Sequence, residues 1–134
     1  MNDAPVPSPT PFVRPSLPAN LGASPLVLHP WNEAGMAAAL SGRLVLDGGC
    51  LYVAAEELGG RWLLTFPYPG TDWDGTAIRY DEEELPVGEL FVFGGGEVDL
   101  TEANADGFDW VKPPDPACLI GKAWFVYNVD APSP

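Results

Sequence analysis

Short runs of β-forming residues, separated by glycine or proline, follow one another from residue 43 to residue 129. Residues 43–46 and 50–53 are separated by Asp47, Gly48 and Gly49, and this spacing is typical of a β-hairpin. About six such runs fall within roughly 90 residues, and several are apolar on both faces, as a small barrel with a partly covered outer surface requires. The sequence therefore predicts an all-β fold, a small OB-like or SH3-like barrel, with a β-sandwich as the alternative.

Three glycine groups are expected to shape this fold. Gly48 and Gly49 predict a tight turn, Asp74 and Gly75 predict a chain reversal, and residues 94–96 predict a bulge or sharp bend within a long strand. Trp73 is expected to cover one end of the barrel, and the tryptophans inside strands, Trp62 and Trp124, are expected in the core.

Proline sets the expected domain organisation, because eight of the 16 prolines lie in residues 1–30. We predict a flexible leader or linker over residues 1–24, one barrel domain over residues 25–130, and a tail over residues 131–134. Alanine and methionine in residues 34–40 predict one short N-terminal helix, ended by Ser41 and Gly42.

The charge of the chain restricts its partners. The net charge is −13, and 14 of the 19 acidic residues lie in residues 72–134. Because Lys and Arg form no cluster, nucleic acid and anionic membranes are unfavourable partners, and no apolar run is long enough to span a bilayer. A protein or small ligand is the expected partner of a chain that we expect to be a monomer.

The sequence predicts no enzyme, cofactor or metal site. The single histidine, His29, is expected at the mobile end of the proline-rich segment, and neither a GxSxG motif nor zinc-ligand spacing is present. Residues 72–83 match a calcium loop only in part, since Thr76 and Ala77 occupy two key positions. Cys50 and Cys118 allow one disulfide, with two buried thiols as the alternative.

The long acidic loop at residues 101–117, which contains two aromatic residues, is the expected binding surface, together with the Trp73 turn. The main hypothesis is a non-enzymatic binding module. The alternatives are an acidic inhibitor or immunity-type protein that blocks a basic partner, and a calcium-binding extracellular domain. The candidate binding residues are Trp73, Asp74, Glu97, Asp106, Phe108, Asp109 and Trp110.

The order Gly49-Cys50-Leu51-Tyr52, Trp73-Asp74-Gly75, Gly94-Gly95-Gly96-Glu97 and Cys118 resembles a small all-β domain of bacterial secreted proteins and lipoproteins. The resemblance covers about residues 42–129. That domain has no established activity, so the resemblance implies fold and context alone. It favours a Cys50–Cys118 pair and an extracytoplasmic location. A cytoplasmic location stays the alternative, because the N-terminus shows no signal-peptide pattern.

Overall fold

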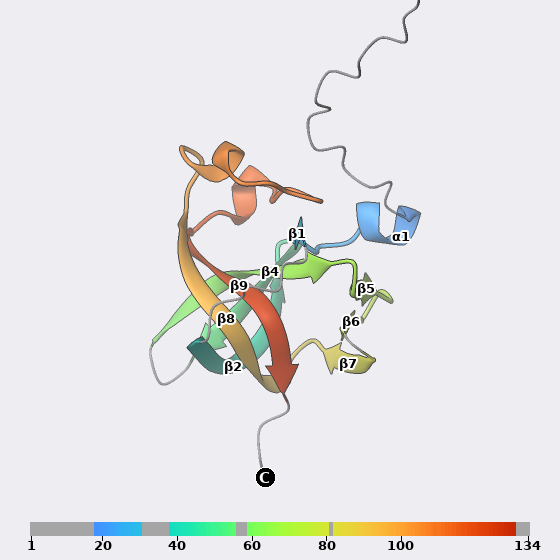
Figure 1. Cartoon of the computed structure of the whole chain (residues 1–134). Coiled ribbons are helices and arrows are strands. Elements are labelled where there is room, and N and C mark those ends of the chain that lie inside the picture. The colour runs from blue at the N-terminus through green and yellow to red at the C-terminus, as the bar shows by residue number, and fades with distance from the viewer. Residues whose placement is uncertain (1–17, 31–37, 56–58, 81, 131–134) are drawn as a thin grey trace, which may run out of the picture.

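The computed structural model describes residues 18–30, 38–55, 59–80 and 82–130. Five strands close into a barrel (Figure 1). They are β2 (Ala38–Asp47), β3 (Cys50–Ala55), β4 (Gly60–Tyr68), β8 (Leu90–Leu100) and β9 (Gly121–Asp130). Strand β2 pairs with β3 and with β8, β3 pairs with β4, and β8 pairs with β9, all antiparallel. The parallel pairing of β4 with β9 closes the barrel.

The order β2-β3-β4-β9-β8, with its parallel contact between the third and fifth strands, is that of an OB-type Greek-key barrel. The predicted all-β barrel is therefore confirmed. OB-type barrels commonly bind ligands on the outer wall of their second and third strands and on two adjacent loops. In this chain that wall is formed by β3 and β4, and the adjacent loops are the β2–β3 turn and residues 101–120.

Smaller elements surround the barrel. Strand β1 (Leu28–Pro30) runs parallel to β4, and a separate antiparallel sheet lies at the right of Figure 1 beside the short helix α1 (Ala19–Gly22). The sheet contains β5 (Thr71–Trp73), β6 (Ala77–Tyr80) and β7 (Glu83–Pro86). Two 3-10 turns, η1 (Ala105–Gly107) and η2 (Pro116–Cys118), lie in the loop between β8 and β9.

Alternate residues of the barrel strands form its core. Phe66 and Phe93 are fully buried and meet edge to face, with ring centroids 6.4 Å apart. Trp62 and Trp124 also belong to this interior cluster, as predicted. Because these side chains come from β4, β8 and β9, their burial joins strands that are distant in the sequence.

The glycines of the β2–β3 turn have the predicted role. Gly48 and Gly49 have φ values of 61° and 81° in this turn, which suit glycine. A bulge is also present where residues 94–96 predicted one, but its additional residue lies on the partner strand. Between Gly94 and Gly95 the register shifts past Tyr127 of β9, so β9 is the bulged strand.

A short N-terminal helix is present, as expected, but it is α1 at Ala19–Gly22. The placement expected at residues 34–40 is wrong where the structure tests it. Residues 31–37 lie outside the described residues, but residues 38–40 begin β2 and pair with β8. Leu40 is buried opposite Phe93. This pairing outweighs the helix propensity of the neighbouring alanines, because propensity is a weak preference beside burial.

The predicted domain boundary also needs correction. Leu21 is 2% exposed and packs in the interior cluster, so helix α1 belongs to the domain although residues 1–24 were expected to form a leader. Residues 1–17 and the expected tail, 131–134, lie outside the described residues. None of the described helices is long and apolar enough to cross a membrane.

Strand bounds depend on pairing as well as on local residues. Strand β4 continues through Pro67 to Tyr68 alongside the parallel strand β1. Strand β8 begins at Leu90. Before it, Glu83 and Glu84 are exposed residues of β7.

Candidate functional site

A belt of apolar side chains crosses the outer surface of the barrel in register. Tyr52 on β3 lies opposite Leu63 on β4, and Leu63 lies opposite Ala123 on β9. Val45 and Val98 continue the belt at its two ends. These residues form a second cluster, separate from the barrel interior, with Trp110 and Cys118 of loop 101–120. The loop therefore covers part of the wall that OB-type barrels use for ligands.

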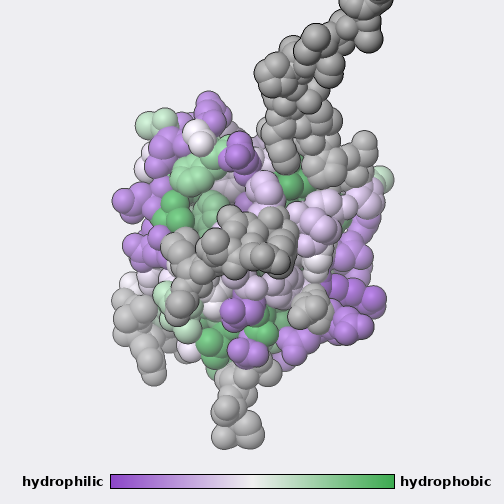
Figure 2. Space-filling model, viewed as in Figure 1, coloured by the Kyte–Doolittle hydropathy of each residue, from purple (hydrophilic) through white to green (hydrophobic). Residues whose placement is uncertain are grey.

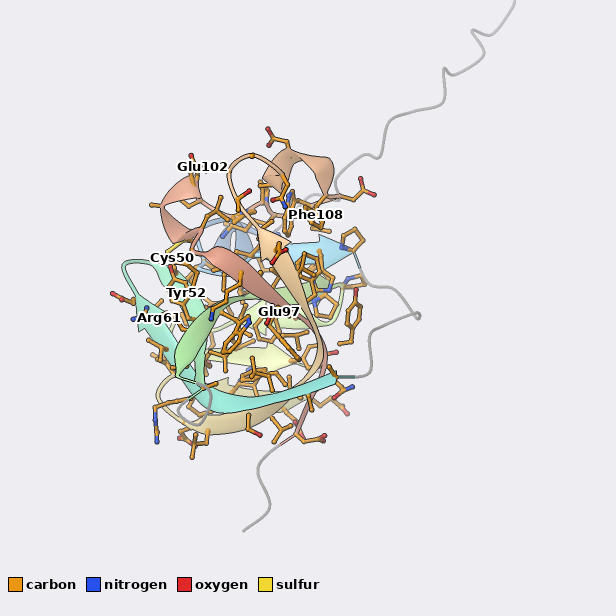
Figure 3. All side chains as sticks on the ribbon, turned by 90° about the vertical axis from the view of Figure 1, so that its left-hand side faces the viewer. Cys50, Tyr52, Arg61, Glu97, Glu102 and Phe108 are labelled. Atoms are coloured by element: carbon orange, nitrogen blue, oxygen red, sulfur yellow. A yellow bond between two sulfur atoms is a disulfide. The ribbon has the colours of Figure 1, made fainter. Side chains whose placement is uncertain are left out.

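A disulfide fixes this loop to the barrel. Cys50 and Cys118 are bonded at 2.02 Å, and their Cα atoms are 5.6 Å apart, within the usual range. The bond joins the β2–β3 turn to η2, and the Tyr52 hydroxyl donates to the Cys118 carbonyl at 3.1 Å. The predicted disulfide is thus present, close to Tyr52 on the barrel wall (Figure 3).

Hydrogen bonds within the loop fix its shape. The Asn104 side chain accepts from the Thr101 amide at 2.7 Å and donates to the Asp99 carbonyl at 2.9 Å. The Trp110 indole donates to the Ala105 carbonyl at 2.7 Å. The loop is consequently ordered before any partner binds.

The exposed side of the loop combines carboxylates with one aromatic ring. Phe108 is partly exposed, and its ring centroid lies 5.6 Å from Trp110 and 5.7 Å from Phe125. Figure 2 shows hydrophilic residues around the loop at the upper left, with a small hydrophobic area among them. Phe108 and Glu102 both lie above the barrel in Figure 3. The exposed carboxylates of the loop are Glu102, Asp106, Asp109 and Asp115.

Two candidate binding residues prove to be core residues. Trp110 is 5% exposed and lies beneath the loop, while Trp73 is 9% exposed and packs in the interior cluster. Neither indole is available as a surface platform, because neighbouring residues cover both rings.

Asp74 lies on the β5–β6 turn, at the right of Figure 1, and not beside the acidic loop. Its Oδ1 accepts from the amides of Thr76 and Ala77 at 2.9 and 2.8 Å. These bonds lower the pKa of the Asp74 carboxyl and build the predicted reversal with Gly75. Throughout the described part of the chain, no three His, Cys, Asp or Glu side chains gather as a metal site.

Glu97 also has a structural partner. Its carboxylate accepts from the Trp62 indole at 2.8 Å, and the Lys122 ammonium lies 4.1 Å from the centroid of the Trp62 ring. On the neighbouring wall, Arg61 stacks over Tyr52 at 4.9 Å and pairs with Asp47 at 3.1 Å. Sequence reasoning missed these pairs, because each forms across strands.

The position of His29 differs most clearly from the expectation. It was expected at a mobile end, but it lies in β1, is 3% exposed and stacks on Phe125 at 4.9 Å. Its Nδ1 is 2.8 Å from the Thr65 hydroxyl, and its Nε2 has no hydrogen-bond partner among the residues that the structure describes. Burial lowers the pKa of His29 to about 4, although the Val126 backbone opposes this effect. The apolar run preceding His29 was the available signal of burial.

A cavity of about 250 Å³ lies between residues 24–27 and residues 112–115. Lys112 lines it, and its ammonium donates to the Ser24 carbonyl. Burial lowers the pKa of Lys112. Cys118 and Gly49 also border this cavity, so the space adjoins the disulfide.

Comparisons of this chain with known protein families, with characterised proteins and with solved structures gave no match. Fold and geometry define it as an OB-type barrel whose β3–β4 wall is partly covered by its own disulfide-bonded acidic loop.

Proposed function

We propose that this protein is a non-enzymatic binding module that uses the exposed side of loop 101–120 to bind a basic protein surface. The observation that carries the proposal is Phe108, a partly exposed ring that stands between two exposed acidic residues, Asp106 and Asp109, in the sequence of the loop. An aromatic ring among carboxylates suits Arg or Lys side chains, which can stack on the ring while they pair with the acids.

The order of the loop supports the same proposal. Asn104, Trp110 and the disulfide hold the loop in one conformation, so binding would cost little conformational entropy. The net charge of −13 would accelerate encounters with a basic partner and would make association sensitive to salt.

An extracytoplasmic location is part of this proposal. The Cys50–Cys118 bond supports it, because disulfides persist mainly in oxidising compartments.

Capture from an extract of the source cells tests the proposal with three forms of the full chain. The test form is Asp106→Asn/Asp109→Asn. The matched control is Glu83→Gln/Glu84→Gln, which removes the same charge from exposed positions on β7. We expect the native and control chains to capture the same basic protein, and the loop variant to bind it about tenfold more weakly at low salt.

The salt dependence of binding distinguishes the contribution of the carboxylates from that of Phe108. The effect of the Asp106→Asn/Asp109→Asn change should fade as NaCl screens the charges, whereas Phe108→Ala should weaken binding at every salt concentration. Equal binding of the native chain and both loop variants would rule out this surface. If the captured protein is an enzyme that loses activity at a 1:1 ratio, the alternative of an acidic inhibitor is the correct one.

A further inference from the structure

The second half of the loop, residues 113–120, has few attachments to the barrel. Its backbone bonds are local: the Cys118 amide donates to the Asp115 carbonyl at 2.8 Å, and the Leu119 amide donates to the Pro116 carbonyl at 3.2 Å. Among the described residues, its hydrogen bond to the barrel is the one from the Tyr52 hydroxyl to the Cys118 carbonyl. The disulfide is its covalent attachment.

The first half of the loop is held differently. Val111 and Lys112 donate backbone bonds to the Leu28 carbonyl at 2.9 and 3.0 Å, and Lys112 accepts one from the Leu28 amide. Trp110 is buried against Phe125, with ring centroids 5.8 Å apart. Residues 101–112 therefore have attachments that do not need the disulfide.

Packing beneath residues 113–115 is incomplete. The cavity of about 250 Å³ separates them from residues 24–27, so little apolar contact holds that stretch down. Cys118 and the partly buried Leu119 are what this segment contributes to the outer cluster. Tyr52, which is 5% exposed, bonds to this segment through the Cys118 carbonyl.

We propose that the Cys50–Cys118 bond is a redox latch, and that its reduction by a protein dithiol releases residues 113–120 and uncovers Tyr52 on the wall formed by β3 and β4. One thiolate of the dithiol attacks a sulfur of the bond and forms a mixed disulfide. The second thiol of the dithiol then displaces the protein sulfur. Two electrons and two protons end on the thiols of Cys50 and Cys118, and the dithiol leaves as a disulfide.

The barrel itself should survive reduction. Its interior cluster does not include either cysteine, and the parallel β4–β9 pairing closes it without the disulfide. Local release of a weakly attached segment, with the rest still folded, is a common form of protein opening.

Hydrogen exchange of the full chain, read by mass spectrometry, tests the latch with dithiothreitol as the dithiol. We expect exchange at the amides of Asp115 and residues 117–120 to accelerate about tenfold or more after reduction, while β8 and β9 stay protected. A Cys50→Ser/Cys118→Ser chain should exchange quickly in this segment with or without dithiothreitol.

Hydroxyl-radical labelling gives a second readout in the same samples. Labelling of Tyr52 should increase on reduction, whereas Trp62, which is 6% exposed and belongs to the barrel interior, should not change. Unchanged exchange at residues 115–120 after full reduction would overturn the latch. Equally faster hydrogen exchange in β8 and β9 would also overturn the latch, because the disulfide would then stabilise the whole fold and not one segment.

Discussion

At Gly95 the backbone leaves no room for a side chain. A Cβ atom there would lie 1.8 Å from the Phe125 carbonyl oxygen, at a φ of 154°. This close approach lies at the register shift, where Tyr127 of β9 has no ladder partner on β8. Glycine at this position is therefore a requirement of the β8–β9 pairing.

Gly95→Ala is expected to destabilise the protein by about 2–4 kcal/mol, because either the bulge or the β8–β9 pairing must shift. Urea unfolding followed by tryptophan fluorescence measures the change. Gly22→Ala is the matched control, since a Cβ there meets nothing within 4 Å, and it should be nearly neutral. A small effect of Gly95→Ala would mean that the strands can separate without cost.

His29 gives the fold a dependence on pH. Its pKa is about 4 in the folded protein, against an ordinary value of 6.5, so the unfolded chain binds its proton more readily. The contribution of neutral His29 to the free energy of unfolding is complete above about pH 6.5 and decreases as the pH falls towards 4. The loss of this contribution is about 3 kcal/mol at most.

The variant His29→Gln should reduce this dependence, because glutamine does not titrate and can still bond to Thr65. Free energies of unfolding at pH 7 and pH 4.5, measured for both chains, isolate the histidine contribution from that of the carboxylates. The native chain should lose more stability than the variant over this range. An identical loss in the two chains would show that His29 titrates normally.

The loop between β8 and β9 depends on Trp110 as its internal core. The indole fills the space under the loop and also bonds to the Ala105 carbonyl. Packing and hydrogen bonding at this position can be separated by two substitutions.

Trp110→Ala is expected to cost about 3–5 kcal/mol, and Trp110→Phe, which keeps an aromatic ring but not the N–H donor, about 1–2 kcal/mol. Thermal unfolding shows which variant is less stable, and hydrogen exchange should show the loss of protection in residues 101–110. If both variants matched the native protein, the loop would not need its buried ring.

Local signals explain which elements were predictable. The β2–β3 hairpin and the Asp74–Gly75 reversal depend on adjacent residues, so the sequence predicts them. The glycines beside the bulge are a local signal of the same kind. The start of β2 at Ala38 was not predictable in the same way, because it depends on pairing with β8, far along the chain. Likewise, the burial of His29 depends on Phe125 and Thr65.

The candidate site was predictable only in part, because its composition is local but its packing depends on distant residues. The acidic loop and its aromatic residues were visible in the sequence, but which ring is exposed was not. Phe108 and Trp110 are two residues apart, and both rings pack against Phe125, with centroids 5.7 and 5.8 Å from it. Trp110 is the buried one because it lies within the outer cluster, whose other members come from distant parts of the chain. Trp73 and Asp74 were grouped with the loop by residue type, whereas the fold places them on another sheet.

At the scale of the whole molecule, charge repulsion dominates electrostatics. The net charge is −13, and the ion pair between Arg61 and Asp47 is the one found among the described residues. Salt should therefore screen more repulsion than attraction.

Raising NaCl from low to moderate concentration at pH 7 should increase the Tm by on the order of 5 °C, which corresponds to roughly 1 kcal/mol. Scanning calorimetry measures the shift, and light scattering at both salt concentrations should report a monomer. A Tm that falls with salt would mean that attractive pairs outweigh the repulsion.

The disulfide has a topological consequence for the covalent chain. Because it joins residues 68 positions apart, residues 50–118 form a closed ring from which the two ends of the polypeptide extend. A protease that cuts one peptide bond inside this ring leaves a single molecule, because the disulfide still joins the two pieces. Such a nick would appear on a gel only after reduction, while a cut outside the ring would release a fragment at once.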